Sequence, residues 1–249
     1  MKITTGWSPS GYREYAHRFA ATFERYWPAG IGYSAWVEEF SGAPRATERR
    51  LFEIPGVLEF FERHAGDRAA RGREVSAAWK PGDRRIGYNW RLDAMKFCRQ
   101  VFIIAEAGRE AEEGELLLWL DADVVTHAPC SPEAIGALLP DGFDLAYLGR
   151  EPKHSEIGFQ LYRVNERTRR MHTYFRELYA GDRIFSEKEW HSAYALDLAR
   201  RWAESHVGLK SWNLTPGGRG HVWHQSPLTQ WLDHLKGDRK QAGRSPERK

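Results

Sequence analysis

Two carboxylates one residue apart, Asp121 and Asp123, end a continuous apolar run of strand length in the segment 115–125. Such a run is typical of a fully buried strand, and open α/β sheets bind their ligands beyond the carboxyl ends of their strands. Two like charges at one place repel each other and raise each other's pKa, so the pair needs a counter-charge. Mg²⁺ and Mn²⁺ prefer carboxylate oxygens and keep positions open for substrate phosphates. The pair therefore indicates a metal–diphosphate site, and the alternative is a solvated turn after a strand.

A second motif near the C-terminus has the pattern His-x-x-Gly-x-x-Lys, with His234, Gly237 and Lys240 at its fixed positions. Neutral imidazole is a good third ligand for a divalent ion of the transition type. Glycine lets the backbone approach a phosphate closely or adopt a positive φ, and lysine neutralises diphosphate oxygens. Together the two motifs predict three metal ligands, Asp121, Asp123 and His234, with Gly237 and Lys240 at the diphosphate. The alternative for the second motif is a helix that ends at Gly237 and continues as a basic, solvated tail.

The first forty residues predict the unit that would hold a nucleotide. A β-branched strand at 2–5, a helix at 12–26 and a strand at 31–40 form a βαβ unit with a right-handed crossover. Such a unit suits a nucleotide-binding half-domain. Thr5 and Gly6 end the first strand and Tyr12 opens the helix, so we expect these three residues at the base and ribose. The alternative for Tyr12 is aromatic packing at a helix start.

The rest of the chain predicts further helices and strands in one domain. The segment 41–85 is charged, irregular and helical in pieces. We expect helices at 90–107, 132–139, 167–179 and 187–204, strands at 143–148 and 157–164, a loop at 210–225, and a last helix that starts at 226 and runs into His234. The chain shows no internal repeat and no clear linker, so the predicted fold class is α/β, in a single domain.

Arg91, Asp93 and Lys96 open the helix that leads toward the carboxylate strand. Their charges suit the ribose or another part of a nucleotide substrate, so they are candidates for the cofactor-binding side. The alternative for Asp93 and Lys96 is an ion pair on the helix surface, because their spacing allows one.

Three more residues are candidates for the chemistry on a hydroxyl-bearing substrate. Glu156 stands just before a strand that starts at Ile157, and Glu189 and His191 stand in the first turn of a predicted helix. Carboxylates can bind hydroxyl groups or activate them as nucleophiles. The alternative is helix capping and ordinary surface charge.

Bulk properties set the class of protein. A chain of 249 residues is long enough for one large α/β domain, and a formal net charge of +3 does not by itself imply nucleic acid. Two cysteines, Cys98 and Cys130, make neither a disulfide framework nor a zinc site, which favours a reducing cytoplasm. We expect no membrane-spanning segment and no signal peptide. The tail 236–249 is basic, which suits a phosphate-rich partner or a solvated terminus.

Asp121, Asp123, His234 and Lys240 match position by position the motifs of the glycogenin-like and galactosyltransferase-like retaining enzymes, so the chain resembles the GT-A nucleotide-diphospho-sugar transferases. The resemblance implies that the Asp pair and the histidine hold Mn²⁺ and that the lysine contacts the diphosphate. That branch has Pro-Trp after the lysine, whereas this chain has Gln241 and Ala242, which argues against close membership of the branch.

A closer resemblance runs along most of the chain, to the TET-associated glycosyltransferases of phages and their bacterial hosts. It rests on the segments 90–97, 119–123, 155–159, 189–191 and 233–240. The resemblance implies transfer of a sugar from a UDP-sugar to the hydroxyl of 5-hydroxymethylcytosine in DNA, in the cytoplasm of the host cell if the protein is encoded by a bacteriophage. The family has an Asp after its Glu-Trp-His segment, where this chain has Ser192, so the acceptor role of that position is open.

The combined prediction is a GT-A fold, a Rossmann-like mixed sheet flanked by helices, in one domain over 1–249. The segment 1–125 is its nucleotide-sugar half, 126–235 its acceptor half and 236–249 its basic tail. The predicted activity is a metal-dependent transfer of a hexose or N-acetylhexosamine from a UDP-sugar, with Mn²⁺ or Mg²⁺ as cofactor and with retention of configuration by the resemblance.

Two rival functions stay open at this stage. One is a GT-A transferase that acts on a saccharide, a protein or a small molecule, and the other is a non-catalytic DNA-binding protein. A nucleotidyltransferase is disfavoured, because the loop at 6–11 contains no Arg or Lys. The oligomeric state is not predicted.

Overall fold

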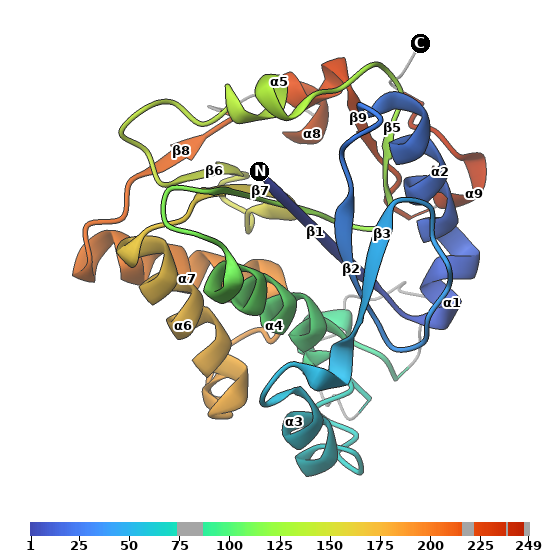
Figure 1. The fold of residues 1–249 in the computed structure, drawn as a ribbon. Helices are drawn as coiled ribbons and strands as arrows, with labels where there is room; N and C mark the ends of the chain where they lie inside the picture. Colours follow the sequence, from blue (N-terminus) through green and yellow to red (C-terminus); the bar gives the residue numbers. More distant parts are fainter. Residues whose placement is uncertain (74–86, 216–221, 238, 247–249) are drawn as a thin grey trace.

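A mixed seven-stranded sheet forms the centre of the molecule (Figure 1). The structure is a computed structural model, and it describes residues 1–73, 87–215, 222–237 and 239–246. The order across the sheet is β3-β2-β1-β4-β7-β6-β8. These strands are β1 (Lys2–Trp7), β2 (Tyr33–Val37), β3 (Ala46–Arg50), β4 (Leu116–Leu120), β6 (Leu145–Leu148), β7 (Glu156–Arg163) and β8 (Ser211–Asn213). The expected α/β class, with a mixed sheet flanked by helices, is confirmed.

The N-terminal βαβ unit is present as predicted. After β1 the chain forms the short helix α1 (Pro9–Gly11), a π-helical turn and α2 (His17–Tyr26), and then returns as β2, which pairs in parallel with β1. Ser8 caps the start of α1, because its side chain accepts a hydrogen bond from the backbone N–H of Gly11 at 3.2 Å. The helical segment brings the chain back to the same end of the sheet, so β1 and β2 end side by side.

The segment 41–85 was predicted to be irregular with helical pieces, and this prediction missed a strand. It contains α3 (Val57–Arg63), as expected in part, but also β3, which pairs in parallel with β2. Four of the five residues of β3 are polar, and β3 lies at the edge of the sheet, so the apolar pattern of a buried strand is missing. Residues 74–86 lie outside the described part of the chain.

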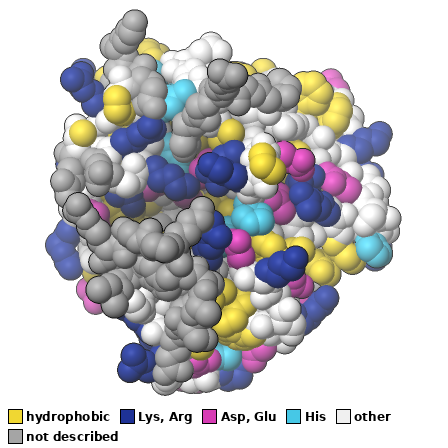
Figure 2. Space-filling view, turned by 180° about the vertical axis from the view of Figure 1, so that it is seen from behind, with side chains coloured by type: hydrophobic (Ala, Val, Ile, Leu, Met, Phe, Trp, Pro, Cys, Tyr) yellow, Lys and Arg dark blue, Asp and Glu magenta, His cyan; other side chains and the backbone are white. Residues whose placement is uncertain are grey.

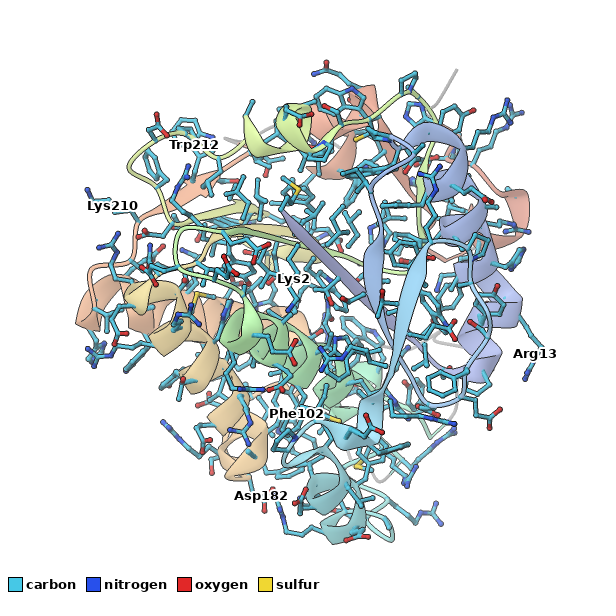
Figure 3. All side chains as sticks on the ribbon, viewed as in Figure 1. Lys2, Arg13, Phe102, Asp182, Lys210 and Trp212 are labelled. Carbon is cyan, nitrogen blue, oxygen red and sulfur yellow. The ribbon has the colours of Figure 1, made fainter. Side chains whose placement is uncertain are left out.

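Helices cover both faces of the sheet (Figure 1). One face carries α4 (Ala94–Glu110), α6 (Glu166–Ala180) and α7 (Ser192–His206), and the other carries α2, α5 (Pro132–Gly136) and α8 (Val222–Gln225). Successive residues of β4 alternate between two hydrophobic cores: Leu117 and Trp119 pack with α4, and Leu118 and Leu120 pack on the opposite face. Figure 3 shows side chains filling both layers, with Phe102 of α4 directed toward α3. No helix in the described ranges is both long enough and apolar enough to cross a membrane.

The helices at 90–107 and 167–179 and the strands at 143–148 and 157–164 are confirmed to within a few residues as α4, α6, β6 and β7. The short helix at 132–139 is present as α5. The helix predicted from 187 instead begins at Ser192, because His191 is its N-cap.

The last predicted helix, from 226 into His234, is wrong. A single 3-10 turn at Pro227–Gln230 is followed by β9 (Leu232–His234), which pairs antiparallel with β5 (Val124–Thr126). A strand of three residues is too short to show a periodicity, and its partner lies far away in the sequence, so local patterns could not reveal it. The predicted loop at 210–225 likewise contains β8 and α8, while 216–221 lie outside the described residues.

Candidate metal and nucleotide site

The pairing of β5 with β9 brings the three predicted metal ligands together. Asp121 and Asp123 follow β4, and His234 ends β9 opposite Val124. The Nε2 atom of His234 lies 3.0 Å from Oδ1 of Asp123 and 3.9 Å from Oδ2 of Asp121. One ligand atom from each residue lies within 4.8 Å of the others. Two motifs more than a hundred residues apart thus form one cluster.

The missing side chain of Gly158 leaves the space that the His234 ring occupies. A Cβ atom at residue 158 would lie 2.8 Å from Cε1 and 3.1 Å from Nδ1 of this ring. Contacts this short are not tolerated, so any larger residue on β7 would displace the imidazole. The glycine two residues after Glu156 therefore makes room for the imidazole of His234, a predicted metal ligand.

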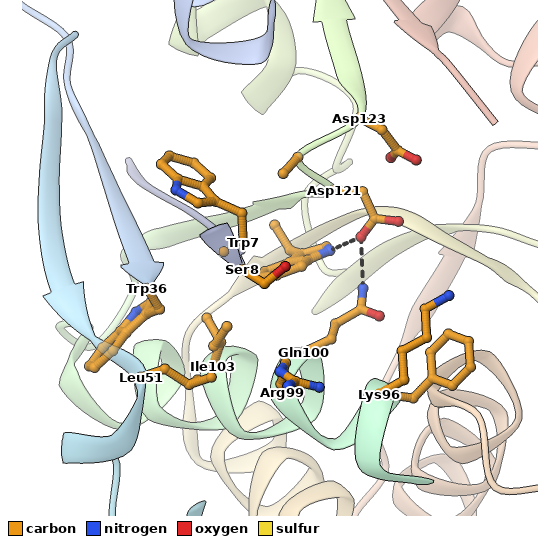
Figure 4. A pocket seen from close by; sticks show the side chains of 14 residues that line it. Trp7, Ser8, Trp36, Leu51, Lys96, Arg99, Gln100, Ile103, Asp121 and Asp123 are labelled. Atoms are coloured by element: carbon orange, nitrogen blue, oxygen red, sulfur yellow. Dashed lines mark hydrogen bonds between the residues drawn. The ribbon is translucent and has the colours of Figure 1, made fainter. Parts of the chain in front are cut away.

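Two donors fix the orientation of Asp121. The indole N–H of Trp119 and the side-chain amide of Gln100 both donate to Oδ1 of Asp121, each at 2.9 Å (Figure 4). The other oxygen, Oδ2, faces His234. Outer hydrogen bonds of this kind orient metal ligands, and they leave one carboxylate oxygen directed at the centre of the cluster.

The side chains of the cluster shift one another's pKa values. Burial, followed by the charge of Asp123, raises the pKa of Asp121 to about 6. Burial also disfavours the charged forms of Asp123 and His234, but their mutual attraction outweighs it. The pKa of Asp123 therefore lies well below its ordinary value and that of His234 above it. Two carboxylates and one imidazole are a donor set that suits Mn²⁺ and, with less preference for the nitrogen, Mg²⁺.

Lys240 supplies a further positive charge. Its ammonium lies 3.0 Å from Oδ2 of Asp123 and 4.0 Å from the centre of the Tyr15 ring. Gly237 has a φ of +64°, a conformation that suits glycine, and the backbone N–H of Lys240 bonds back to its carbonyl at 3.1 Å. This turn brings the lysine to the carboxylate, so the predicted His-x-x-Gly-x-x-Lys motif forms one compact unit.

A cavity of about 270 Å³ opens beside the two aspartates (Figure 4). Its lining includes Gly6, Trp7, Trp36, Lys96, Phe97, Arg99, Gln100 and Trp119. A Cβ atom on Gly6 would lie 2.6 Å from Cδ1 of Ile103, so this glycine lets α4 approach the end of β1. Indole rings and cationic side chains next to two carboxylates form a suitable lining for a nucleotide.

The structure separates the predicted nucleotide-side residues into two groups. Gly6 and Lys96 line the cavity, whereas Thr5 is buried and Tyr12 packs against Trp7 with ring centres 5.6 Å apart. Asp93 caps α4, since its side chain accepts from the backbone N–H of Lys96 at 3.0 Å.

Arg91 lies on another side of the site, where its guanidinium is 3.5 Å from Glu189. The surface ion pair between Asp93 and Lys96 that the sequence left open is replaced by the helix cap. Four residues of the cavity lining were not predicted: Gln100, Trp119, Trp36 and Arg99. They meet at the cavity because α4 packs against the sheet, and no local sequence pattern reveals that packing.

Glu156 lies behind His234, with Oε1 3.8 Å from Nδ1. Only 1% of its side chain is exposed, and the ammonium of Lys236 lies 2.9 Å away. Burial opposes the charged form, yet His234, Lys236 and Arg150 outweigh it and lower the pKa of Glu156 to about 2. The negative charge of Glu156 on this side of the imidazole favours the protonated form of His234, and the catalytic role expected of Glu156 stays a prediction.

The comparisons with known proteins found similarity in the fold of the chain but not in its sequence. No protein-family model matches the sequence, and no curated protein matches it. An active-site mutant of the galactosyltransferase LgtC is similar in structure, with 12% identity over 95% of this chain and 88% of that chain and a TM-score of 0.49. Mouse xyloside xylosyltransferase 1 shares 10% identity over 86% of this chain and 84% of its own, with a TM-score of 0.49. The glycosyltransferase GlyE of Streptococcus pneumoniae shares 9% identity over 85% and 44%, with a TM-score of 0.48.

Proposed function

We propose that this protein is a metal-dependent glycosyltransferase of the GT-A type that uses a UDP-sugar. The proposal rests on one observation. Asp121, Asp123 and His234 come together at the edge of a cavity whose lining suits a nucleotide. Lys240 and His234 offset the charge of Asp123 in the structure, and in this proposal a divalent cation takes over that role when the nucleotide binds.

Each part of the site has a role in this proposal. Asp121, Asp123 and His234 hold Mn²⁺ or Mg²⁺, which when bound stabilises negative charge on the departing diphosphate. Lys240 leaves Asp123 and binds diphosphate oxygens, and Lys96 at the cavity wall adds positive charge. The indole rings of the cavity offer faces for the base and ribose, and they keep water from the sugar–phosphate bond.

The acceptor is the finer part of the proposal. The resemblance to the TET-associated glycosyltransferases supports 5-hydroxymethylcytosine in DNA as the acceptor and retention of configuration at the sugar. Figure 2 shows Lys and Arg side chains interspersed with acidic and histidine side chains in the middle of one face, and these cations would meet the phosphates of such an acceptor. A saccharide, a protein or a small molecule suits the same donor site equally well.

One experiment separates these functions. The protein is incubated with Mn²⁺, a mixture of UDP-sugars and DNA that contains 5-hydroxymethylcytosine, and the released UDP and the digested nucleosides are measured by mass spectrometry. A hexose or N-acetylhexosamine added to the modified cytosine would support the whole proposal. Metal-dependent release of UDP without a modified nucleoside would keep the transferase and reject the DNA acceptor.

The matched variants are Asp121→Asn with Asp123→Asn, and Asp141→Asn as a control with a fully exposed side chain away from the cavity. We expect the double variant to lose at least a hundredfold in UDP release and the control to keep it. Full activity of the double variant, or DNA affinity with no UDP release from any protein, would favour a non-catalytic DNA-binding protein.

A further inference from the structure

A second group of ionisable side chains lies beyond the cavity, formed by His154, Glu189 and His191. Nε2 of His191 lies 2.7 Å from Oε2 of Glu189, and Nε2 of His154 lies 3.5 Å from the same oxygen. The three residues have ligand atoms close enough to hold a metal ion. The hydrogen bonds of His191 decide between a metal site and another role.

His191 carries its proton on the nitrogen that faces Glu189. It is the N-cap of α7, and its Nδ1 accepts a hydrogen bond from the backbone N–H of Tyr194 at 3.3 Å. Burial lowers the pKa of His191 to about 4 despite the neighbouring Glu189, so the ring is neutral and has a single proton. Because Nδ1 is an acceptor, that proton is on Nε2 and is donated to Glu189. A metal ion at Nε2 would displace this proton, and with Nδ1 still accepting from Tyr194 the ring would then carry no proton at all. We therefore interpret the group as a carboxylate that His191 holds by a hydrogen bond, and not as a second metal centre.

This carboxylate is linked to the proposed metal site. Ser192, the residue after His191, donates from Oγ to Oε1 of Gln100 at 2.7 Å, and the amide of Gln100 donates to Asp121 at 2.9 Å. The ring of His191 also packs on Phe97, which lines the cavity, with centroids 5.9 Å apart. Glu189 is therefore connected, through His191 and Ser192, to Phe97 and Gln100 of the cavity lining.

An exposed aromatic ring completes the group. The side chain of Trp90 is 43% exposed, unusual for a tryptophan, and its ring centroid lies 4.9 Å from that of His191. The guanidinium of Arg91 lies 5.7 Å from the same ring and 3.5 Å from Glu189. A tryptophan face beside a carboxylate offers stacking and a hydrogen-bond acceptor to a single bound molecule.

We propose that Trp90, Glu189 and His191 form the acceptor subsite of the transferase, an inference that rests on the proposed function. The ring of the acceptor stacks on Trp90, and its hydroxyl donates a hydrogen bond to Glu189, whose oxygens offer further lone pairs beside those that accept from His191 and Arg91. His191 is a positioning residue that acts through Glu189. The ligand chemistry is a ring with an apolar face and a hydroxyl on it or one carbon away, as in a hydroxymethylated nucleobase or in a pyranose.

Two activities of the same holoenzyme test the subsite. Metal-dependent release of UDP without acceptor reports the donor site alone. Sugar transfer is measured in parallel to an oligonucleotide that contains 5-hydroxymethylcytosine and to free lactose and glucose. This comparison reports on the acceptor site and shows whether the bound ring is a nucleobase or a pyranose. Stacking on an aromatic side chain contributes about 1–3 kcal/mol, so we expect Trp90→Ala to raise the acceptor KM by roughly 5–150-fold and to leave UDP release within about twofold.

Matched variants separate the role of each residue. Trp90→Phe should recover most of the acceptor affinity, and Trp212→Ala, which removes a ring that is 41% exposed on β8, should change neither activity. Glu189→Gln should raise the acceptor KM with UDP release unchanged.

At residue 191, His191→Gln keeps a donor toward Glu189, whereas His191→Asn keeps the helix cap and loses that donor. We expect transfer to survive in the glutamine variant and to fall in the asparagine variant. The opposite order would show that His191 only caps α7 and would overturn its positioning role.

The failures are distinguishable. If the wild-type protein releases no UDP with any UDP-sugar, the transferase function itself fails. If UDP release is normal but Trp90→Ala and Glu189→Gln transfer like the wild type, or no member of the panel is glycosylated, the subsite is wrong. Stoichiometric Zn²⁺ binding by an Asp121→Asn, Asp123→Asn protein that is lost with His191→Asn would also overturn it, in favour of a metal centre.

Discussion

Lys240 competes with the metal ion for Asp123, and its removal should have opposite effects on two ligands. In Lys240→Met the chain length is kept and the charge is lost. Without nucleotide, we expect Mn²⁺ to bind more tightly, because the ion no longer has to displace an ammonium that lies 3.0 Å from Oδ2 of Asp123. With Mn²⁺ present, we expect UDP to bind more weakly, because the diphosphate loses a cationic partner.

The size of the effect follows from the geometry. Two unit charges 3.0 Å apart attract each other by about 5 kcal/mol at an effective dielectric constant near 20. Desolvation and side-chain entropy offset most of this attraction, and the two side chains are 23% and 12% exposed, so the net coupling is about 1–2 kcal/mol. The Mn²⁺ dissociation constant should therefore fall by roughly 5–30-fold, since 1.4 kcal/mol corresponds to a factor of ten.

Electron paramagnetic resonance of free Mn²⁺ measures this constant directly. The control is Lys210→Met, the same substitution at an exposed residue next to the edge strand β8 (Figure 3). If Mn²⁺ binds to Lys240→Met no more tightly than to the wild type, Lys240 does not hold the place of the cation and the reasoning is refuted.

Three further predictions concern the metal ligands and the core. Gly158→Ala should weaken Mn²⁺ binding at least tenfold in the same titration, because its Cβ would lie 2.8 Å from the ring of His234; unchanged affinity would mean that the ring does not contribute. Mn²⁺ affinity should rise from pH 5 to pH 7, because Asp121, with a pKa of about 6, and His234, with a raised pKa, must lose protons to bind the ion; a flat profile by calorimetry would contradict this. Gly108→Ala should lower the melting temperature by roughly 4–8 °C, since overpacking costs about 2 kcal/mol and the new Cβ would lie 2.1 Å from a buried histidine ring, whereas Gly30→Ala, with nothing within 4 Å, should not.

The sequence predicted the parts of the site whose signals are local. The apolar run of β4 is long enough to show a buried strand, and two carboxylates at its end need no tertiary information to indicate a metal. Gly237 and Lys240 have a fixed spacing, and the structure places Lys240 3.0 Å from Asp123, while their role at a diphosphate stays a prediction. The βαβ unit followed from helix and strand patterns of ordinary length.

The rest of the site depends on contacts that no short window contains. Leu232–His234 is held as a strand by its partner Val124–Thr126, and without that partner the preceding Ser-Pro pattern favours a helix. Gln100 can donate its hydrogen bond to Asp121 because one turn of α4 faces the end of β4. The buried position of Glu156 depends likewise on how β7 meets His234, which no local pattern shows.

The separation of the ligands along the chain has a consequence for biosynthesis. His234 and Asp123 are 111 residues apart, so the ribosome produces the two carboxylates long before their third partner. At about 5–20 residues per second, several seconds pass during which the nascent chain can form β1, β2 and β4 but cannot complete the cation site. Under the proposed function, a divalent ion could contact only the Asp pair until β9 forms. The ion bound to all three residues would then stabilise the pairing of the last strand with the part of the chain that folded earlier.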